Sequence, residues 1–262
     1  MLRNFITSLF IISIIVGCVT SPMGRSQLAF MPASELETMG VKAFNSVKEE
    51  TPINTDTNIN RYTNCITQSI LQTFNNNGQS WEVVVFRDDA ANAFALPGGK
   101  VGVYDGLLNV AKSQDQLATV IGHEIAHVLS RHGNERVSQE FALQQGLTLI
   151  QAIAQPKTQM GQTLMGLLGV GAQFGILLPY SRIQESEADA LGLQLMSRAG
   201  FNPRESVALW QNMEKAGGGQ PPEFLSTHPS HGRRIQDLNS RMAQALQLQQ
   251  QAQGSGRTPH CQ

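Results

Sequence analysis

The sequence predicts a mostly helical α+β fold, with a single domain built around a small antiparallel sheet. Most of the chain carries apolar residues at spacings of three and four, the period of a helix, whereas the short β-branched runs typical of strands lie between positions 81 and 104. The 262 residues are 41% apolar and 15% charged. This composition supports one large core and excludes a disordered chain.

Charge and composition also exclude several classes of protein. Lys and Arg number 19 against 20 Asp and Glu, so no excess charge directs the chain to nucleic acid. Three cysteines are too few for a disulfide scaffold or a Cys-rich zinc module. No apolar stretch reaches roughly 18 residues, which excludes a polytopic membrane protein.

Local signals place the first elements. Ser34 and Glu37 form a capping box that starts a helix expected to end near position 50, and an apolar stripe predicts a second helix over 59–74. Extended, apolar or β-branched runs predict three strands, over 81–86, 93–96 and 100–104. The Pro-Gly-Gly turn that precedes position 100 is expected to join the last two strands as a hairpin.

The second half of the chain is expected to be helical. A capping box of Ser113 and Gln116 starts a helix that runs to about Arg131 and has a wide apolar face. Further helices are expected over 134–154, over 182–198, from Pro203, and over 230–247. The apolar segment 164–178 contains three glycines and is short for a membrane span, so a buried helix or a flap near a cleft is favoured over a membrane-dipping hairpin.

Residues 1–17 have the pattern of a signal peptide. A basic start is followed by an apolar block of about 12 residues, too short to cross a bilayer, and by a small residue. A buried N-terminal helix is the alternative. Ile15-Val16-Gly17-Cys18 resembles the lipobox of bacterial lipoproteins, which implies a lipid anchor on Cys18. Val19 stands where an inner-membrane retention signal usually places Asp, so the resemblance implies the periplasmic face of the outer membrane.

Cys65 and Cys261 are expected to form a disulfide. With Cys18 assigned to lipid, these two remain as a pair in an oxidising compartment, where such bonds persist. The bond would pin the C-terminal segment 246–262, which is expected to be a Gln-rich flexible tail. Two unrelated free thiols are the alternative.

The sequence His123-Glu124-Ile125-Ala126-His127 lies in a strongly predicted helix. Residues four apart share a helix face, so both imidazoles can reach one Zn²⁺ while Glu124 addresses the fourth ligand position. Core or surface histidines without a metal are the alternative, but two buried unpaired imidazoles would carry a desolvation cost. His132 is one residue out of register with the third histidine of a metzincin, so we expect it to be a cation at a helix C-terminus.

A carboxylate from a second helix is the expected third ligand. The candidates are Glu185, Glu187 and Asp189. Glu185 and Asp189 are four residues apart, so one helix face offers a ligand and a second carboxylate that could orient a ligating histidine. Glu187 is expected to point elsewhere.

Four features together resemble the zinc metallopeptidases of the CAAX prenyl protease/HtpX family, closest to periplasmic lipoprotein members such as BepA and LoiP. They are the stretch 92–99, the H-E-x-x-H, the string 181–189, and Thr227-His228-Pro229 with Arg234 six residues beyond the histidine. The resemblance covers roughly residues 60 to 240. It implies a zincin-like metalloprotease domain, expected over 57–245 after a leading segment 18–56. It further implies that Glu185 is the third zinc ligand, that Asp189 lies behind a ligand, that His228 lies near the metal and that Arg234 faces the cleft.

The expected function is that of a zinc-dependent endopeptidase with one Zn²⁺ per chain, cleaving misfolded or unassembled cell-envelope proteins. Glu124 is the expected general base, and the resemblance adds His228 and Arg234 as catalytic residues. The expected partners are those substrates and, through the lipid anchor, the membrane, with no nucleic acid. The alternative is a chaperone-like envelope assembly factor whose peptidase site is latent and capped by His228. Both functions need the same zinc site.

Overall fold

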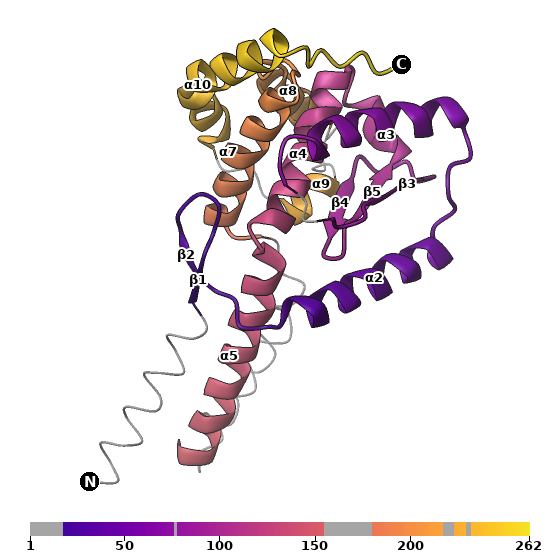
Figure 1. Ribbon diagram of the computed structural model, residues 1–262. Coiled ribbons are helices and arrows are strands. Elements are labelled where there is room, and N and C mark those ends of the chain that lie inside the picture. The colour runs from indigo at the N-terminus through magenta and orange to yellow at the C-terminus, as the bar shows by residue number, and fades with distance from the viewer. Residues whose placement is uncertain (1–17, 76–77, 155–179, 217–222, 229–231) are drawn as a thin grey trace.

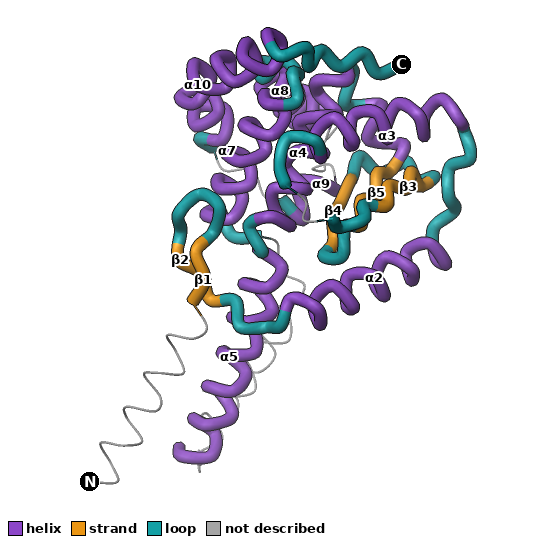
Figure 2. The backbone as a smooth tube through the Cα atoms, viewed as in Figure 1, coloured by secondary structure: helices purple, strands orange, loops and turns teal. Residues whose placement is uncertain are grey.

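The fold is mostly helical with a small sheet, which confirms the predicted α+β class (Figure 2). The expected signal peptide 1–17 and the apolar segment 164–178 lie outside the part of the chain that the structure describes. None of the described helices is both long and apolar enough to cross a membrane. The computed structural model describes residues 18–75, 78–154, 180–216, 223–228 and 232–262.

Helices α4 (Gln114–Leu129) and α7 (Arg182–Arg198) form the centre of the fold (Figure 1). Their backbones approach closely at two glycines. A Cβ added at Gly192 would lie 2.8 Å from the backbone nitrogen of His123, and one added at Gly122 would lie 3.1 Å from the carbonyl oxygen of Gly192. Because glycine has no Cβ, the helices come near enough for side chains from both to meet at one point.

The sheet contains β3 (Glu82–Phe86), β4 (Ala93–Leu96) and β5 (Lys100–Tyr104), in the order β3-β5-β4. β4 and β5 form the expected antiparallel hairpin, whose turn uses Gly98 and Gly99 at φ angles of 85° and 69°. β5 lies between β3 and β4, so the loop from β3 to β4 leaves room for one strand. The chain reverses its direction twice between β3 and β5, and these two strands therefore pair in parallel. β4 is therefore an edge strand, and it packs beside α4.

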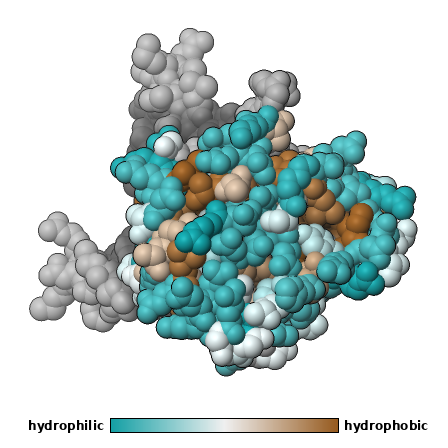
Figure 3. Space-filling model, turned by 90° about the horizontal axis from the view of Figure 1, so that it is seen from above, coloured by the Kyte–Doolittle hydropathy of each residue, from teal (hydrophilic) through white to brown (hydrophobic). Residues whose placement is uncertain are grey.

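Helices cover the sheet and complete the core. In Figure 1, α2 (Ala33–Glu50) and α3 (Thr57–Leu71) lie on opposite sides of the sheet, and one cluster of buried apolar side chains joins the sheet, α3, α4 and α7. The face of the molecule seen from above is mostly hydrophilic, with separate apolar patches (Figure 3). The remaining elements are β1 (Cys18–Thr20), β2 (Ser26–Leu28), the 3₁₀ helix η1 (Asp105–Asn109), α5 (His132–Ala154), α8 (Glu205–Ala216), α9 (Glu223–Thr227) and α10 (Arg234–Gly254).

One expected helix cap does not form. Helix α2 starts at Ala33, with Pro32 at the N-cap position and no side-chain hydrogen bond to the helix end. Ser34 therefore lies inside the first turn and cannot form a capping box with Glu37. At α4 the expected N-cap forms, because the hydroxyl of Ser113 accepts a hydrogen bond from the backbone N–H of Gln116.

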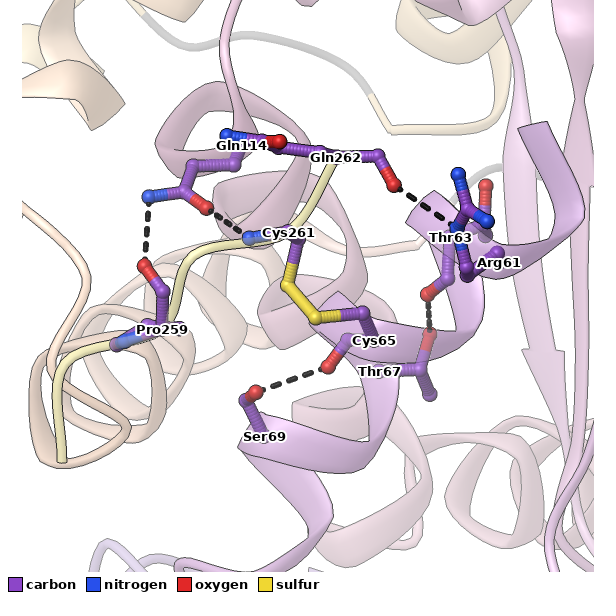
Figure 4. Close-up of a disulfide and its surroundings, with 9 residues drawn as sticks. All are labelled: Arg61, Thr63, Cys65, Thr67, Ser69, Gln114, Pro259, Cys261 and Gln262. Carbon is purple, nitrogen blue, oxygen red and sulfur yellow. Dashed lines mark hydrogen bonds between the residues drawn. A yellow bond between two sulfur atoms is a disulfide. The ribbon is translucent and has the colours of Figure 1, made fainter. Parts of the chain in front are cut away.

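The C-terminal segment 246–262, expected as a flexible tail, is held against the domain. Helix α10 continues well into it, and beyond the helix Cys261 forms a disulfide with Cys65 of α3. The Gln114 side chain binds the tail twice, donating to the carbonyl of Pro259 at 3.0 Å and accepting from the N–H of Cys261 at 2.9 Å (Figure 4). The disulfide and these two hydrogen bonds thus hold the end of the chain against the domain.

Candidate metal centre

Four buried side chains meet between α4 and α7. His123 and His127 come from one face of α4, Glu185 comes from the first turn of α7, and His228 follows α9. Their ligand atoms all lie within 4.8 Å of one another, and the four residues are between 0% and 3% exposed. The structure therefore brings together the three residues expected as metal ligands and the histidine expected near the metal.

The spacing of the donor atoms fits a tetrahedral zinc ion. Nε2 of His123 lies 3.0 Å from Nε2 of His127, 3.2 Å from Nδ1 of His228 and 3.4 Å from Oε2 of Glu185. The other oxygen of Glu185 lies 3.4 Å from Nε2 of His127 and 3.1 Å from Nδ1 of His228. Zinc bound at about 2.0–2.1 Å in a tetrahedron separates its ligand atoms by about 3.3 Å, and imidazole nitrogen and carboxylate oxygen are donors that it prefers.

The charges of the site favour a bound cation. Burial would raise the pKa of Glu185, but the neighbouring imidazoles, His123 foremost, hold it well below its ordinary range, so the carboxylate stays ionised. Burial lowers the pKa of His127, which keeps its ring neutral, as a metal ligand must be. At His123 burial lowers the pKa, yet Glu185 and Asp189 outweigh burial and raise it to about 9. These carboxylates thus stabilise positive charge at the point where the donor atoms converge.

Asp189 and Arg234 hold His123 from behind. Oδ1 of Asp189 lies 3.0 Å from Nδ1 of His123, so a carboxylate sets the tautomer of that ring. Nη2 of Arg234 donates to Oδ1 of Asp189 at 2.7 Å and to Oε2 of Glu185 at 3.2 Å, and the guanidinium lies 3.5 Å from the centre of the Trp210 ring. Arg234 was expected to face the cleft. The structure places it behind the ligands, where it neutralises two buried carboxylates.

His132 lies beside the site, contrary to expectation, and Glu187, which points away from the donor cluster as expected, contacts His132. Nδ1 of His132 lies 2.9 Å from Nδ1 of His127, and its Nε2 lies 3.2 Å from Oε2 of Glu187. His132 is 0% exposed, and burial lowers its pKa, so it is a neutral ring rather than a helix C-terminal cation. The cause is the backbone of Arg131, whose φ of 54° turns the chain after α4 so that His132 starts α5 and faces back into the site.

Glu124 lies beside the ligands with one oxygen unused. Its carboxylate accepts a hydrogen bond from the backbone N–H of Ala95 in β4, while Oε1 has no hydrogen-bond partner among the described residues. Oε1 lies 3.4 Å from Nε2 of His228. Burial raises the pKa of Glu124, although the nearby imidazoles of His228 and His123 oppose the rise. The carboxylate is therefore a stronger base than that of an exposed glutamate.

A cleft with a volume of about 1010 Å³ opens beside His127. Its walls come from α2, from Ala95 and Leu96 of the edge strand β4, and from the start of α5. Tyr180 also lines the cleft, with its ring stacked on that of His127 and the two ring centres 4.0 Å apart. Burial raises the pKa of Tyr180 to about 12. Tyr180 was not expected at the site, because it lies outside every motif of the sequence.

Comparison with known proteins identifies the family. The sequence profile of Peptidase family M48 matches residues 58–242. The chain belongs to peptidase family M48. In this M48 chain the matched region contains both histidines of the H-E-x-x-H, Glu185 and His228, and it ends within α10.

Several curated relatives share much of this region. The chain is 41% identical over 167 residues to mitochondrial metalloendopeptidase OMA1 of Schizosaccharomyces pombe, covering 63% of this chain and 48% of that protein. It is 36% identical over 179 residues to the mitochondrial metalloendopeptidase OMA1 of Homo sapiens, covering 65% and 34%. The beta-barrel assembly-enhancing protease of Escherichia coli is 27% identical over 231 residues, covering 85% and 47%. The chain thus spans about a third to a half of the length of these relatives.

These comparisons correct two expectations. The expected likeness to BepA is the weaker one, because the beta-barrel assembly-enhancing protease shares 27% identity against 36–41% for the OMA1 proteins named above. The expected location at the bacterial outer membrane is contradicted, because the more similar relatives are mitochondrial enzymes. The lipid anchor expected on Cys18 stays a prediction, because the matched region begins only at residue 58. The structure places Cys18 itself at the exposed start of β1.

Proposed function

We propose that this chain is a zinc-dependent endopeptidase that cleaves misfolded or unassembled proteins. One observation carries the proposal: the donors of His123, His127 and Glu185 have tetrahedral spacing beside a cleft that His127 lines, and next to them lies Glu124, whose Oε1 accepts no hydrogen bond from the described residues. Zinc, when bound, supplies a Lewis acid that polarises a carbonyl and lowers the pKa of water toward about 7. The relatives are named as metalloendopeptidases and as a protease, which supports the same activity.

The cleft suits an extended and partly apolar polypeptide. β4 is an edge strand whose Ala95 and Leu96 line the cleft, so a substrate backbone can add to the sheet by hydrogen bonds. Leu36 and Met39 of α2 line it too, and Met39 is 47% exposed. Misfolded proteins expose extended backbone and apolar side chains that folded proteins bury. The cleft therefore favours them as substrates.

Glu124 holds and moves the proton in this proposal. The hydrogen bond from Ala95 fixes the carboxylate against β4, which leaves Oε1 available to accept a proton from water and to return it to the departing amine. The raised pKa of Glu124 matches this double task, because a base with a pKa nearer neutrality both accepts and releases the proton more readily.

The position of His228 favours a second candidate, a chaperone-like protein with a latent peptidase site. Its Nδ1 occupies a corner of the donor cluster, 3.2 Å from His123 and 3.1 Å from Glu185, and its Nε2 faces Glu124 at 3.4 Å. In this arrangement the imidazole blocks both the fourth donor position and the base. Turnover then requires His228 to withdraw.

Hydrolysis of casein, measured together with zinc content, tests both candidates. Glu124→Gln should keep zinc and lose roughly 10²-fold or more in hydrolysis, the usual effect of removing a positioned base. His228→Ala should raise the basal rate if the histidine caps the site. Glu205→Gln is the matched control, because Glu205 accepts a hydrogen bond from Gln116 at 2.8 Å, away from the donor cluster. Equal hydrolysis by wild type and Glu124→Gln would reject the peptidase; a slower His228→Ala with full zinc would reject the cap.

A further inference from the structure

We propose that Arg25 is a positioning residue of the zinc site: it holds Glu187, Glu187 holds His132, and His132 fixes the ring of the ligand His127. Arg25 lies between β1 and β2, outside residues 58–242 that match the family. The inference rests on the proposed zinc site and adds a residue from the N-terminal hairpin to it.

Arg25 binds two buried carboxylates at once. Its Nε donates to Oε2 of Glu187 at 2.6 Å, and its Nη1 and Nη2 donate to the two oxygens of Glu135 at 2.6 and 2.7 Å. Both glutamate side chains are 5% exposed, against 25% for Arg25. A planar guanidinium can serve both partners in one geometry, which a lysine ammonium cannot. Arg25 therefore links the hairpin to α5 through Glu135 and to α7 through Glu187.

The hairpin that carries Arg25 is docked at the end of α4. Oε1 of Gln27 accepts from Nη2 of Arg25 at 2.9 Å, and Nε2 of Gln27 donates to the carbonyl of Ser130 at 2.7 Å. Beyond β2, the N–H of Phe30 donates to the hydroxyl of Ser138 in α5 at 3.1 Å. Figure 1 shows the hairpin beside α7 and the first turns of α5. Arg25 is thus presented to Glu187 by an element that is itself fixed.

The contacts from His127 to Arg25 determine which atom donates and which accepts in each hydrogen bond. Nε2 of His127 faces the donor cluster, so as a ligand it carries no proton and the neutral ring is protonated at Nδ1. Nδ1 then donates to Nδ1 of His132, which must be unprotonated, and Nε2 of His132 donates to Oε2 of Glu187. Arg25 donates to the same oxygen. A carboxylate held by arginine accepts hydrogen bonds and donates none, so it selects the tautomer of His132 and, through it, that of His127.

Without Arg25 this selection weakens. Glu187 would be a buried carboxylate without its cation and would turn toward water, and His132 would lose its acceptor. The other tautomer of His132 would then place its proton against that of His127 and push this ring away from the metal. Loss of a group that orients a ligating histidine typically weakens metal binding about 10- to 100-fold.

Zinc affinity of the full chain, measured by competition with a chelating dye, tests the proposal. Arg25→Ala should raise the dissociation constant about 10- to 100-fold, and the Arg25→Ala/His132→Ala double variant should lose no more than the weaker-binding single variant, because both act on one chain of contacts. The visible spectrum of the Co²⁺-loaded protein should change in Arg25→Ala. Lys48→Ala is the matched control, because it breaks another N-terminal ion pair, 2.9 Å from Glu82, with no contact to His127.

Two results would overturn the inference: unchanged zinc affinity in Arg25→Ala, or losses that multiply in the double variant. If Arg25→Ala does not fold, Glu187→Gln tests the same link from α7, with weaker zinc binding expected and unchanged binding contradicting it. Failure of the proposed function is distinguishable, because wild type would then lack stoichiometric zinc, or would not depend on Glu124 for hydrolysis, whatever residue stands at position 25.

Discussion

Breaking the disulfide between Cys65 and Cys261 should lower the free energy of unfolding by about 2 to 5 kcal/mol. The bond joins residues 196 positions apart, and closing so long a loop contributes about 5 kcal/mol in the chain-entropy model. The cost of its removal stays near that value while the tail remains bound, which Gln114 favours by two hydrogen bonds and Arg61 by donating to the carbonyl of Gln262 at 3.2 Å. Each such bond contributes only about 1 kcal/mol, so the tail can partly detach without the disulfide, and the freedom that the folded state then gains lowers the cost.

Thermal unfolding of wild type, Cys65→Ser and Cys18→Ser measures this effect. For a chain of this size 1 kcal/mol shifts the Tm by about 2–4 °C, so Cys65→Ser should unfold at least about 4 °C lower. Cys18→Ser removes the exposed cysteine at the start of β1 and should leave the Tm unchanged. A reductant should lower the Tm of wild type toward that of Cys65→Ser. If mass spectrometry finds the bond formed and Cys65→Ser nevertheless unfolds with wild type, the tail does not contribute to stability and the reasoning fails.

Three further predictions concern the site and its supports. Glu185→Ala should lose stoichiometric zinc, while Glu187→Ala should keep zinc with lower affinity. Metal analysis and a chelator titration of both variants measure this, and equal behaviour of the two variants would contradict it. Glu135→Gln should lower the free energy of unfolding by about 1.5–3 kcal/mol at neutral pH. Burial raises the pKa of Glu135, but Arg25 and Gln184 outweigh burial and lower the pKa below 4.5. The stability that Glu135 contributes is therefore present above pH 4.5 and is lost as the pH falls through the lowered pKa. A stability difference between wild type and Glu135→Gln that grows in acid would refute this prediction. Gly192→Ala should cost about 1–3 kcal/mol by pushing α7 away from α4, and full zinc binding with unchanged stability in denaturant titrations would contradict it.

The helices that carry the proposed ligands could be predicted from sequence because their signals are local. The apolar face of α4, its Ser113 cap and the four-residue spacing of its histidines all act within one helix. The β4–β5 hairpin was equally predictable, since its turn contains two adjacent glycines. The parallel pairing of β3 was not, because strand order depends on where β5 inserts and no local residue records that choice.

The N-terminal hairpin could not be predicted, for a different physical reason. β1 and β2 have three residues each, too few to show the alternation that marks a strand. What fixes them is remote: Arg25 reaches carboxylates 110 and 162 residues away, and Gln27 reaches Ser130. Contacts of such separation leave no periodic trace in the sequence. The hairpin becomes visible only when the chain is folded.

The two histidines proposed as zinc ligands show how far helical spacing alone can predict a site. Asp189, which contacts His123, stands four residues after the proposed ligand Glu185 on the same helix, and that spacing by itself indicates its role. The support of His127 has no such spacing. It comes through His132, whose direction is set by one left-handed residue between two helices. His132 could therefore be interpreted from sequence as a mismatched ligand or as a cation at a helix end, and the turn at position 131 makes it neither. When the residue that orients a histidine lies on the helix that also supplies another proposed ligand, as Asp189 does, the spacing of the motif predicts it. When that residue follows a reversal of the chain, as His132 does, only the folded structure reveals it.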